Sequence, residues 1–178
     1  MAKRTLDQGL VNEMVSFYNL KEETDLERKL LRETSPRLQE RGHLEPFEFF
    51  EICEWKSTRT KTLVRRNAPE RIKEVSRIAF SCSEDLRPSV LCLLDGVRIP
   101  TASAILSIWD PERFTVYDIR VCDALPTLEH PLLTAATISD AVRSYQAYLV
   151  LARGLATSLG ISLRDLDKTL WTWDKLSA

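Results

Sequence analysis

The sequence predicts an all-α fold of about eight or nine helices, and three observations lead to that prediction. Apolar residues recur at three- and four-residue steps through most of the 178-residue chain. Small polar residues and prolines stand where these periodic runs begin, and Gly160 stands where one of them ends. Residues 114–117 form the only strand-like stretch, and it is too short to require a sheet partner.

Helix starts in the first half of the chain are marked by polar caps or by proline. Thr24 and Asp25 precede a leucine-rich run, and we expect Pro36 to kink or restart that helix because proline lacks an amide proton. Pro46 suits the first turn of the helix that follows Glu45. These signals predict helices over about residues 6–19, from 24 or 25 past 36, 45–55, from 68–70 to 79, and from 83–85 to 94.

The second half of the chain has equally clear boundaries. Asp118 is placed to cap a short helix, and Gly160 is a natural stop for a long one. Ser162 with Asp165 resembles a capping box. The expected elements are a helix over about 101–109, a turn at 110–113, a helix over 118–125, a loop over 126–137, and helices over 138–159 and 162–176.

Composition bounds the class of protein. With 44% hydrophobic and 29% charged residues, the chain is typical of one globular domain, built at most as two lobes. No apolar run approaches the roughly 18 residues of a membrane span, and the polar start lacks the apolar stretch of a secretory signal. We therefore expect a cytoplasmic protein with no membrane partner, and no protein partner can be predicted from the sequence.

Cysteine and histidine usage gives no sign of a metal centre. None of the cysteines is spaced as Cys-x-x-Cys, and neither histidine has a local set of partners. We expect reduced, half-buried thiols and no cofactor. The residues concerned are Cys53, Cys82, Cys92, Cys122, His43 and His130.

Charge is nearly balanced over the whole chain, with a formal net charge of −1, but its distribution is uneven. Residues 56–77 contain eight basic and two acidic side chains, whereas residues 21–55 contain ten acidic and six basic ones. One basic surface on an acidic body suits a polyanion that docks on one side. The alternative is a solvated helix face whose glutamates pair with neighbouring cations. The cations expected to contact phosphate are Lys56, Arg59, Lys61, Arg65 and Arg66.

The segment over residues 93–106 carries the most specific chemical signal. Gly96 allows a tight turn between two helices, and small residues at 102–104 let those helices approach closely. The N-terminus of the second helix then presents unsatisfied amides and the positive end of the helix dipole, which together bind phosphate.

This segment resembles the helix-hairpin-helix of DNA-binding proteins. Over about residues 84–125 the chain is similar to the helix-hairpin-helix DNA glycosylase superfamily (HhH-GPD), in which a hydrophobic–Asp–x–x–hydrophobic segment follows the hairpin. The matching residue for that family's catalytic carboxylate is Asp118, for which a helix cap alone is the alternative role. The resemblance implies duplex DNA as the partner and leaves open a monovalent cation at the hairpin. It also implies DNA contacts from Gly96, Val97, Arg98, Ile99, Pro100 and Thr101.

The resemblance further implies hydrolysis of the N-glycosidic bond of a damaged or modified base. Arg98 stands where the hairpin usually has its second glycine, which alters the turn or offers a guanidinium to phosphate. Pro100 stands where bifunctional members carry a lysine nucleophile, so the expected enzyme is monofunctional. No cysteine follows Cys122, so the iron–sulfur loop of some members is absent.

The family's architecture predicts two lobes in one domain. One lobe joins the N- and C-terminal helices, over about residues 1–44 and 132–178. The other is a helical barrel over about 45–131, with the hairpin at 84–109. Aromatic residues are expected to line a pocket for a flipped base, although each is equally suited to core packing. The candidates are Trp55, Trp109, Tyr117 and Trp171.

Two further functions stay open from the sequence. One is a non-catalytic DNA-binding protein of the same fold, for which the departures at Arg98 and Pro100 argue. The other is a helical protein-interaction module whose basic window, residues 56–77, meets an acidic partner.

Overall fold

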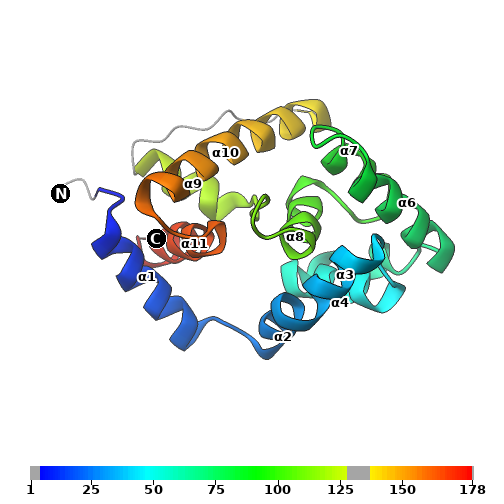
Figure 1. The fold of residues 1–178 in the computed structure, drawn as a ribbon, viewed down its shortest axis with the longest axis horizontal. Helices are drawn as coiled ribbons and strands as arrows, with labels where there is room; N and C mark the ends of the chain where they lie inside the picture. The colour runs from blue at the N-terminus through cyan, green and yellow to red at the C-terminus, as the bar shows by residue number, and fades with distance from the viewer. Residues whose placement is uncertain (1–4, 128–136, 178) are drawn as a thin grey trace. The chain divides into compact units, whose positions relative to one another are not determined.

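The part of the chain that the structure describes, residues 5–127 and 137–177, contains helices and no strand (Figure 1). The structure is a computed structural model. Residues 114–117, the strand-like stretch of the sequence, form a buried segment without regular structure. The predicted all-α class is therefore confirmed.

The chain divides into two compact units, one over Met1–Glu23 and Glu112–Ala178 and one over Thr24–Pro111. We call them unit 1 and unit 2. In the described residues of unit 1, α11 contacts the three other helices and forms the centre of their packing. The helices are α1 (Gln8–Lys21), α9 (Ile119–Thr127), α10 (Ile138–Leu159) and α11 (Leu163–Ser177).

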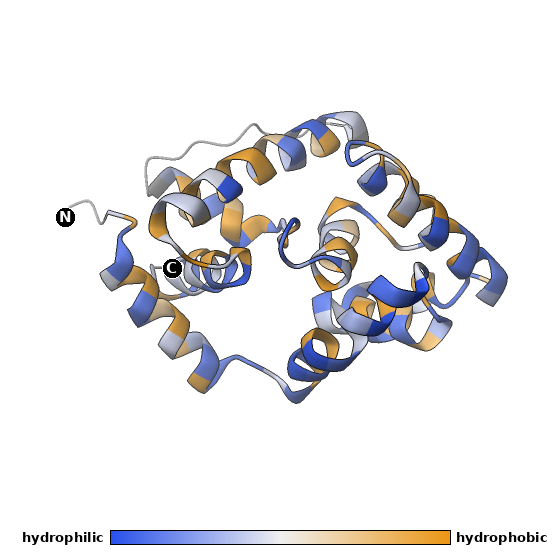
Figure 2. Cartoon of the chain, in the orientation of Figure 1, coloured by the Kyte–Doolittle hydropathy of each residue, from blue (hydrophilic) through white to orange (hydrophobic). Residues whose placement is uncertain are grey.

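Helix α8 has the same central place in unit 2, where it contacts α3, α4, α7 and η1. Residues 101–108 of α8 are all buried and none of them is charged, whereas most other helices carry both hydrophobic and strongly hydrophilic residues (Figure 2). The elements of unit 2 are α2 (Asp25–Lys29), η1 (Leu30–Thr34), α3 (Ser35–Arg41), α4 (Pro46–Lys56), η2 (Thr58–Thr60), α5 (Lys61–Val64), α6 (Pro69–Ser81), α7 (Arg87–Leu91) and α8 (Ile99–Trp109).

The boundaries between the units lie earlier than the lobe boundaries expected from the sequence. The sequence divides the chain near residues 44 and 131, whereas the packing divides it after Glu23 and after Pro111. Helix α2 contacts α4 and helix α3 contacts α8, so both belong to unit 2. Helix α9 contacts α11 and so belongs to unit 1.

Several predicted helix ends are confirmed by local hydrogen bonds. The amide of Glu27 donates to the Thr24 hydroxyl at the start of α2. Helix α10 covers the predicted residues 138–159 and ends at Gly160, whose φ of 65° is left-handed. The Asp165 amide donates to the Ser162 hydroxyl at 3.0 Å, which is one of the two bonds of the predicted capping box, and that hydroxyl donates to the Asp165 carboxylate at 2.8 Å.

Pro36 lies in the first turn of α3, as predicted for a helix that restarts at this proline, and the π-helical stretch η1 precedes it, with the Ser35 amide donating to the Leu30 carbonyl. Two segments differ from the sequence prediction. Helix α7 begins at Arg87, after a turn in which the Leu86 amide donates to the Ser83 carbonyl. The short elements η2 and α5 were not predicted, since four or fewer residues show no apolar period.

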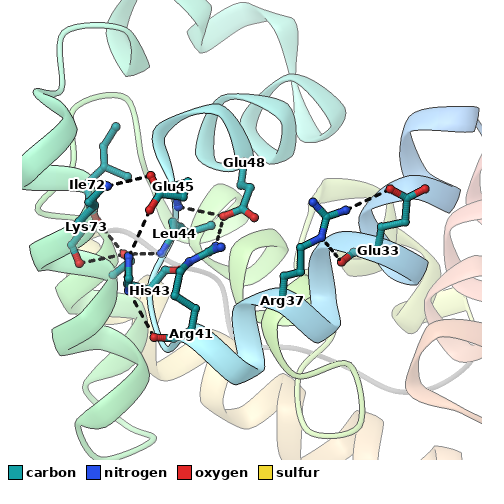
Figure 3. A network of polar contacts seen from close by, with 10 residues as sticks. Glu33, Arg37, Arg41, His43, Leu44, Glu45, Glu48, Ile72 and Lys73 are labelled. Carbon is teal, nitrogen blue, oxygen red and sulfur yellow. Dashed lines mark hydrogen bonds and ion pairs between the residues drawn. The ribbon is translucent and has the colours of Figure 1, made fainter.

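Charged residues near the start of α4 tie this helix to its neighbours (Figure 3). The buried carboxylate of Glu48 forms an ion pair with Arg41 and accepts the amide of Glu45 at 2.9 Å. The carboxylate of Glu45 in turn pairs with Lys73 of α6 at 2.8 Å and lies 3.4 Å from His43 Nε2. Lys73 of the basic window therefore takes its partner from the α3–α4 junction.

Candidate nucleic-acid interface

The predicted hairpin is present in unit 2 as α7, a turn over residues 92–98, and α8. Gly96 adopts the left-handed conformation, with φ of 78°. The amide of Val97 donates to the Leu94 carbonyl at 3.1 Å and closes the turn. The tight turn that the sequence predicts at Gly96 is therefore confirmed.

Gly96 also lies against α5, which the sequence does not indicate. A Cβ atom at this position would lie 2.9 Å from the Cβ of Leu63, from the Cγ1 of Val64 and from the Val64 amide nitrogen. Real Cβ atoms essentially never approach other atoms this closely. The hairpin turn therefore packs directly on the short helix that follows the first cations of the basic window.

Asn67 fixes the other side of the same turn. Its side-chain Nδ2 donates to the carbonyls of Val64 at 2.8 Å and of Asp95 at 2.9 Å. Its Oδ1 accepts the Asp95 amide at 2.8 Å. The Asn67 side chain is buried, so these bonds satisfy an amide that is shielded from water. Sequence reasoning missed this residue.

The N-terminus of α8 has the features expected of a phosphate site. Arg98 is the N-cap residue, and its side chain makes no capping bond to the helix. Pro100 occupies the first turn, where its missing amide proton costs nothing. Burial raises the pKa of the Cys92 thiol to about 11, and the positive charge of Arg98 opposes that increase. The Arg98 guanidinium thus lies close enough to the turn to act on it electrostatically.

Residues 96–101, the six hairpin residues expected to contact DNA, differ in how exposed they are. Arg98 and Pro100 are exposed, and Gly96 is half-buried. Val97, Ile99 and Thr101 are buried, so their side chains pack inside unit 2. Only their main-chain groups are suited to contact a ligand.

The predicted phosphate-contacting cations lie in the same unit as the hairpin. Lys56 is half-buried at the end of α4, and the others are exposed on η2, on α5 and just after α5. Lys61 forms an ion pair with Glu54 at 3.3 Å. We call residues 56–66 the basic segment. Because α5 lies directly against Gly96, the fold brings the basic segment and the hairpin turn together. The exposed cations are Arg59, Lys61, Arg65 and Arg66.

Asp118 lies in unit 1 and caps α9, as predicted. Its Oδ1 accepts the Val121 amide at 3.2 Å, and its carbonyl accepts the Cys122 amide at 3.1 Å. The residue is half-buried. Burial raises the pKa of the Cys122 thiol, and the negative charge of Asp118 one turn earlier raises it further.

The candidate pocket aromatics have packing roles inside their own units. Trp109 stacks on Phe80 with ring centroids 4.6 Å apart, and the Arg87 guanidinium lies 4.7 Å from the Trp109 ring. Tyr117 is buried against two tyrosines of α10, and burial raises its pKa to about 12.

The other two aromatics, Trp55 and Trp171, are half-buried, as Trp109 is. Trp55 lies near the end of α4. Trp171 meets Tyr18 edge-on at 5.6 Å. The structure therefore gives Trp109, Tyr117 and Trp171 packing partners within their own units.

Metal and membrane features were also sought in the described ranges. Residues 5–127 and 137–177 contain no group of three or more histidine, cysteine, aspartate or glutamate side chains arranged to hold a metal ion. Within the same ranges, no helix has both the length and the apolar character of a membrane span. The four cysteines are free thiols, with Cys53 buried and the others half-buried. His130 lies outside the described residues.

Comparisons with protein-family models, with curated proteins and with solved structures find no match to this chain. The candidate residues are therefore described by the geometry within each unit: unit 2 has a hairpin with a segment of exposed cations packed against it, and unit 1 has a helix-capping aspartate.

Proposed function

We propose that this protein binds duplex DNA through the α7–α8 hairpin and hydrolyses the N-glycosidic bond of a damaged or modified base. The observation that supports DNA binding most strongly is the packing of the basic segment against the hairpin turn at Gly96. Helix amides and arginine side chains are both phosphate ligands, and here they belong to contiguous parts of one unit. We infer an HhH-GPD-type helical arrangement from the same hairpin and from the aspartate that follows it.

Asp118 is the proposed catalytic carboxylate. Cleavage of an N-glycosidic bond builds positive charge on the sugar, and a fixed carboxylate beside the sugar stabilises that charge or orients the attacking water. The cap on α9 holds the Asp118 carboxylate in a defined position. The target base must first leave the duplex stack. Pro100 offers no amine for a Schiff base, so the proposed enzyme is monofunctional and needs no cofactor.

A non-catalytic DNA-binding protein is the second candidate. One observation favours it, because the hydrogen bond from the Val121 amide gives Asp118 a structural role that requires no chemistry. The two candidates share the DNA interface and differ only in base release.

The test is base release from a panel of duplexes, each carrying one damaged or modified base. Asp118→Asn is compared with Asp123→Asn, which removes an exposed carboxylate from the same helix. We expect wild type and Asp123→Asn to release a base. The rate of base release by Asp118→Asn should be lower by at least about 100-fold, the scale of a lost catalytic group. Equal rates in the two variants would exclude Asp118 as the catalytic residue.

Binding is measured on the same duplexes over a range of salt. Several phosphate contacts predict a steep fall in affinity as salt increases. Binding without release across the panel would favour the non-catalytic candidate. If neither binding nor release is found, both candidates fail and an all-α interaction module remains.

A further inference from the structure

The strongest unexplained feature of unit 2 is the buried amide of Asn67. This side chain is 5% exposed and joins two segments that are distant in sequence, the end of α5 at Val64 and the hairpin turn at Asp95. All three bonds are 2.8 or 2.9 Å long, and each reaches a main-chain group. A side chain that bonds only to main chain acts on the position of the backbone, whatever side chains its partners carry.

Two further contacts support the same junction. Gly96 leaves no room between the turn and α5, because a Cβ atom there would lie 2.9 Å from Val64. The Arg71 guanidinium of α6 donates to the Leu93 carbonyl at 2.7 Å, on the first part of the turn. The turn is therefore held from α5, from the α5–α6 connection and from α6.

We propose that Asn67 is a positioning residue that makes the basic segment over residues 56–66 and the hairpin a single polyanion-binding surface. The inference rests on the proposed DNA binding and adds how its two contact elements work together. Two charged elements that are held in fixed register engage one duplex at the same time, without an ordering cost on binding. If the junction is loosened, each element must be ordered separately, and the cations on one contribute less to the complex.

The test is a double-mutant cycle on duplex affinity. The charge variant Arg65→Ala/Arg66→Ala is measured in the wild-type background and in Asn67→Ala, with a short duplex of mixed sequence over a range of salt. In the wild-type background we expect the charge variant to reduce the magnitude of the salt slope by about 2 and the affinity by about tenfold or more. In the Asn67→Ala background the charge variant should lower the duplex affinity by about threefold or less, because the effects of coupled residues are not additive.

Ser76→Ala is the matched control. Ser76 is also a buried polar residue of unit 2 whose hydroxyl joins two segments, since it accepts the Leu44 amide at 2.9 Å and donates to the Ile72 carbonyl at 2.7 Å. Its loss weakens the contact between α6 and the segment before α4, and it leaves the bonds of Asn67 to the hairpin turn in place. In the Ser76→Ala background the charge variant should cost as much as in wild type.

Asn67→Asp provides a second variant. It keeps an acceptor for the Asp95 amide, loses both donor bonds and places a carboxylate oxygen against the carbonyls of Val64 and Asp95, so we expect the charge variant to cost no more affinity in this background than in Asn67→Ala. Equal costs of charge removal in the wild-type and Asn67→Ala backgrounds would overturn the inference, and so would a Ser76→Ala background that matches Asn67→Ala. If wild type itself binds no duplex, the proposed function fails, and this inference fails with it.

Discussion

Asn67 pairs with the main chain of Asp95 through both ends of its amide, with Nδ2 2.9 Å from the Asp95 carbonyl oxygen and Oδ1 2.8 Å from the Asp95 amide nitrogen. The hairpin turn is local in sequence, but the group that holds it comes from 28 residues earlier. The candidate DNA interface is therefore a tertiary feature of unit 2, and its residues should be tested together.

Gly96 and Gly42 allow the stability cost of a side chain at positive φ to be measured separately from the cost of a steric overlap. Both have positive φ, 78° and 74°, but a Cβ atom at Gly42 would meet no atom within 4 Å. We expect Gly42→Ala to lower the free energy of unfolding by about 1–2 kcal/mol through backbone strain alone. Gly96→Ala should cost about 1–3 kcal/mol more, because the new methyl group also overlaps Val64.

Urea denaturation measured side by side checks these two values. Gly154→Ala is the control, because Gly154 lies within α10 in open space and alanine is the better helix former. It should raise the free energy of unfolding by about 0.5–1 kcal/mol. Equal losses in Gly42→Ala and Gly96→Ala would show that α5 moves away from the turn at no cost.

Asp118 has a capping role that can be separated from its charge. Asparagine is also a good N-cap, so Asp118→Asn should change the free energy of unfolding by only a few tenths of a kcal/mol. Asp118→Ala leaves the Val121 amide without its partner and should cost about 1 kcal/mol. Thermal and urea unfolding give both values, and base release gives the effect on activity.

The pattern across the two measurements distinguishes the roles of Asp118. If Asp118→Asn and Asp118→Ala both lose base release, and only Asp118→Ala loses stability, catalysis needs the carboxylate charge. If base release persists in Asp118→Asn, the residue is a cap and the catalytic group lies elsewhere.

Glu45 makes the stability of unit 2 depend on pH in the acid range. The hydrogen bond from Lys73 lowers the pKa of the Glu45 carboxyl below its ordinary value of 4.5, with further lowering from His43 and from the charge of Arg41. A carboxyl whose pKa is lower in the folded state stabilises that state above the unfolded pKa, and the contribution is lost as pH falls through the folded pKa.

Glu45→Gln should therefore reduce the melting temperature above about pH 5, where the contribution of Glu45 is fully present. The difference from wild type should shrink as the pH falls below 4.5 and vanish once Glu45 is protonated in both states. Melting temperatures of both proteins across the acid range measure this, with Glu40→Gln, an exposed glutamate of α3, as the control. A difference that persists at the lowest pH would mean that Glu45 acts through packing and not through its charge.

Helix starts were predictable at three positions where a side chain caps its own helix. Thr24, Asp118 and Ser162 all bond within three residues of themselves, and the bounds of α10 agree with the sequence prediction at both ends. The start of α7 was predicted too early, because its preceding turn is closed by main-chain groups that leave no mark on the sequence. The short helix α5 was missed because it is held by the hairpin and not by an apolar period of its own.

Within the candidate site, the sequence located the hairpin turn and the cap at Asp118, but not the residue that positions the turn. Asn67 stands between a basic run and a proline, where a polar residue is unremarkable in sequence. Its burial beside Val64 and Asp95 is the only sign of its role. Val97 and Ile99 likewise look accessible in a turn and are buried.

The sequence by itself determined the all-α class, most helix starts and the tight turn at Gly96, because these depend on hydrogen bonds and backbone torsions within a few residues. The tertiary structure decided where the two units divide, which hairpin side chains remain exposed, and which residue joins the basic segment to the turn. Those properties depend on contacts between residues tens of positions apart, and local periodicity carries no record of such contacts.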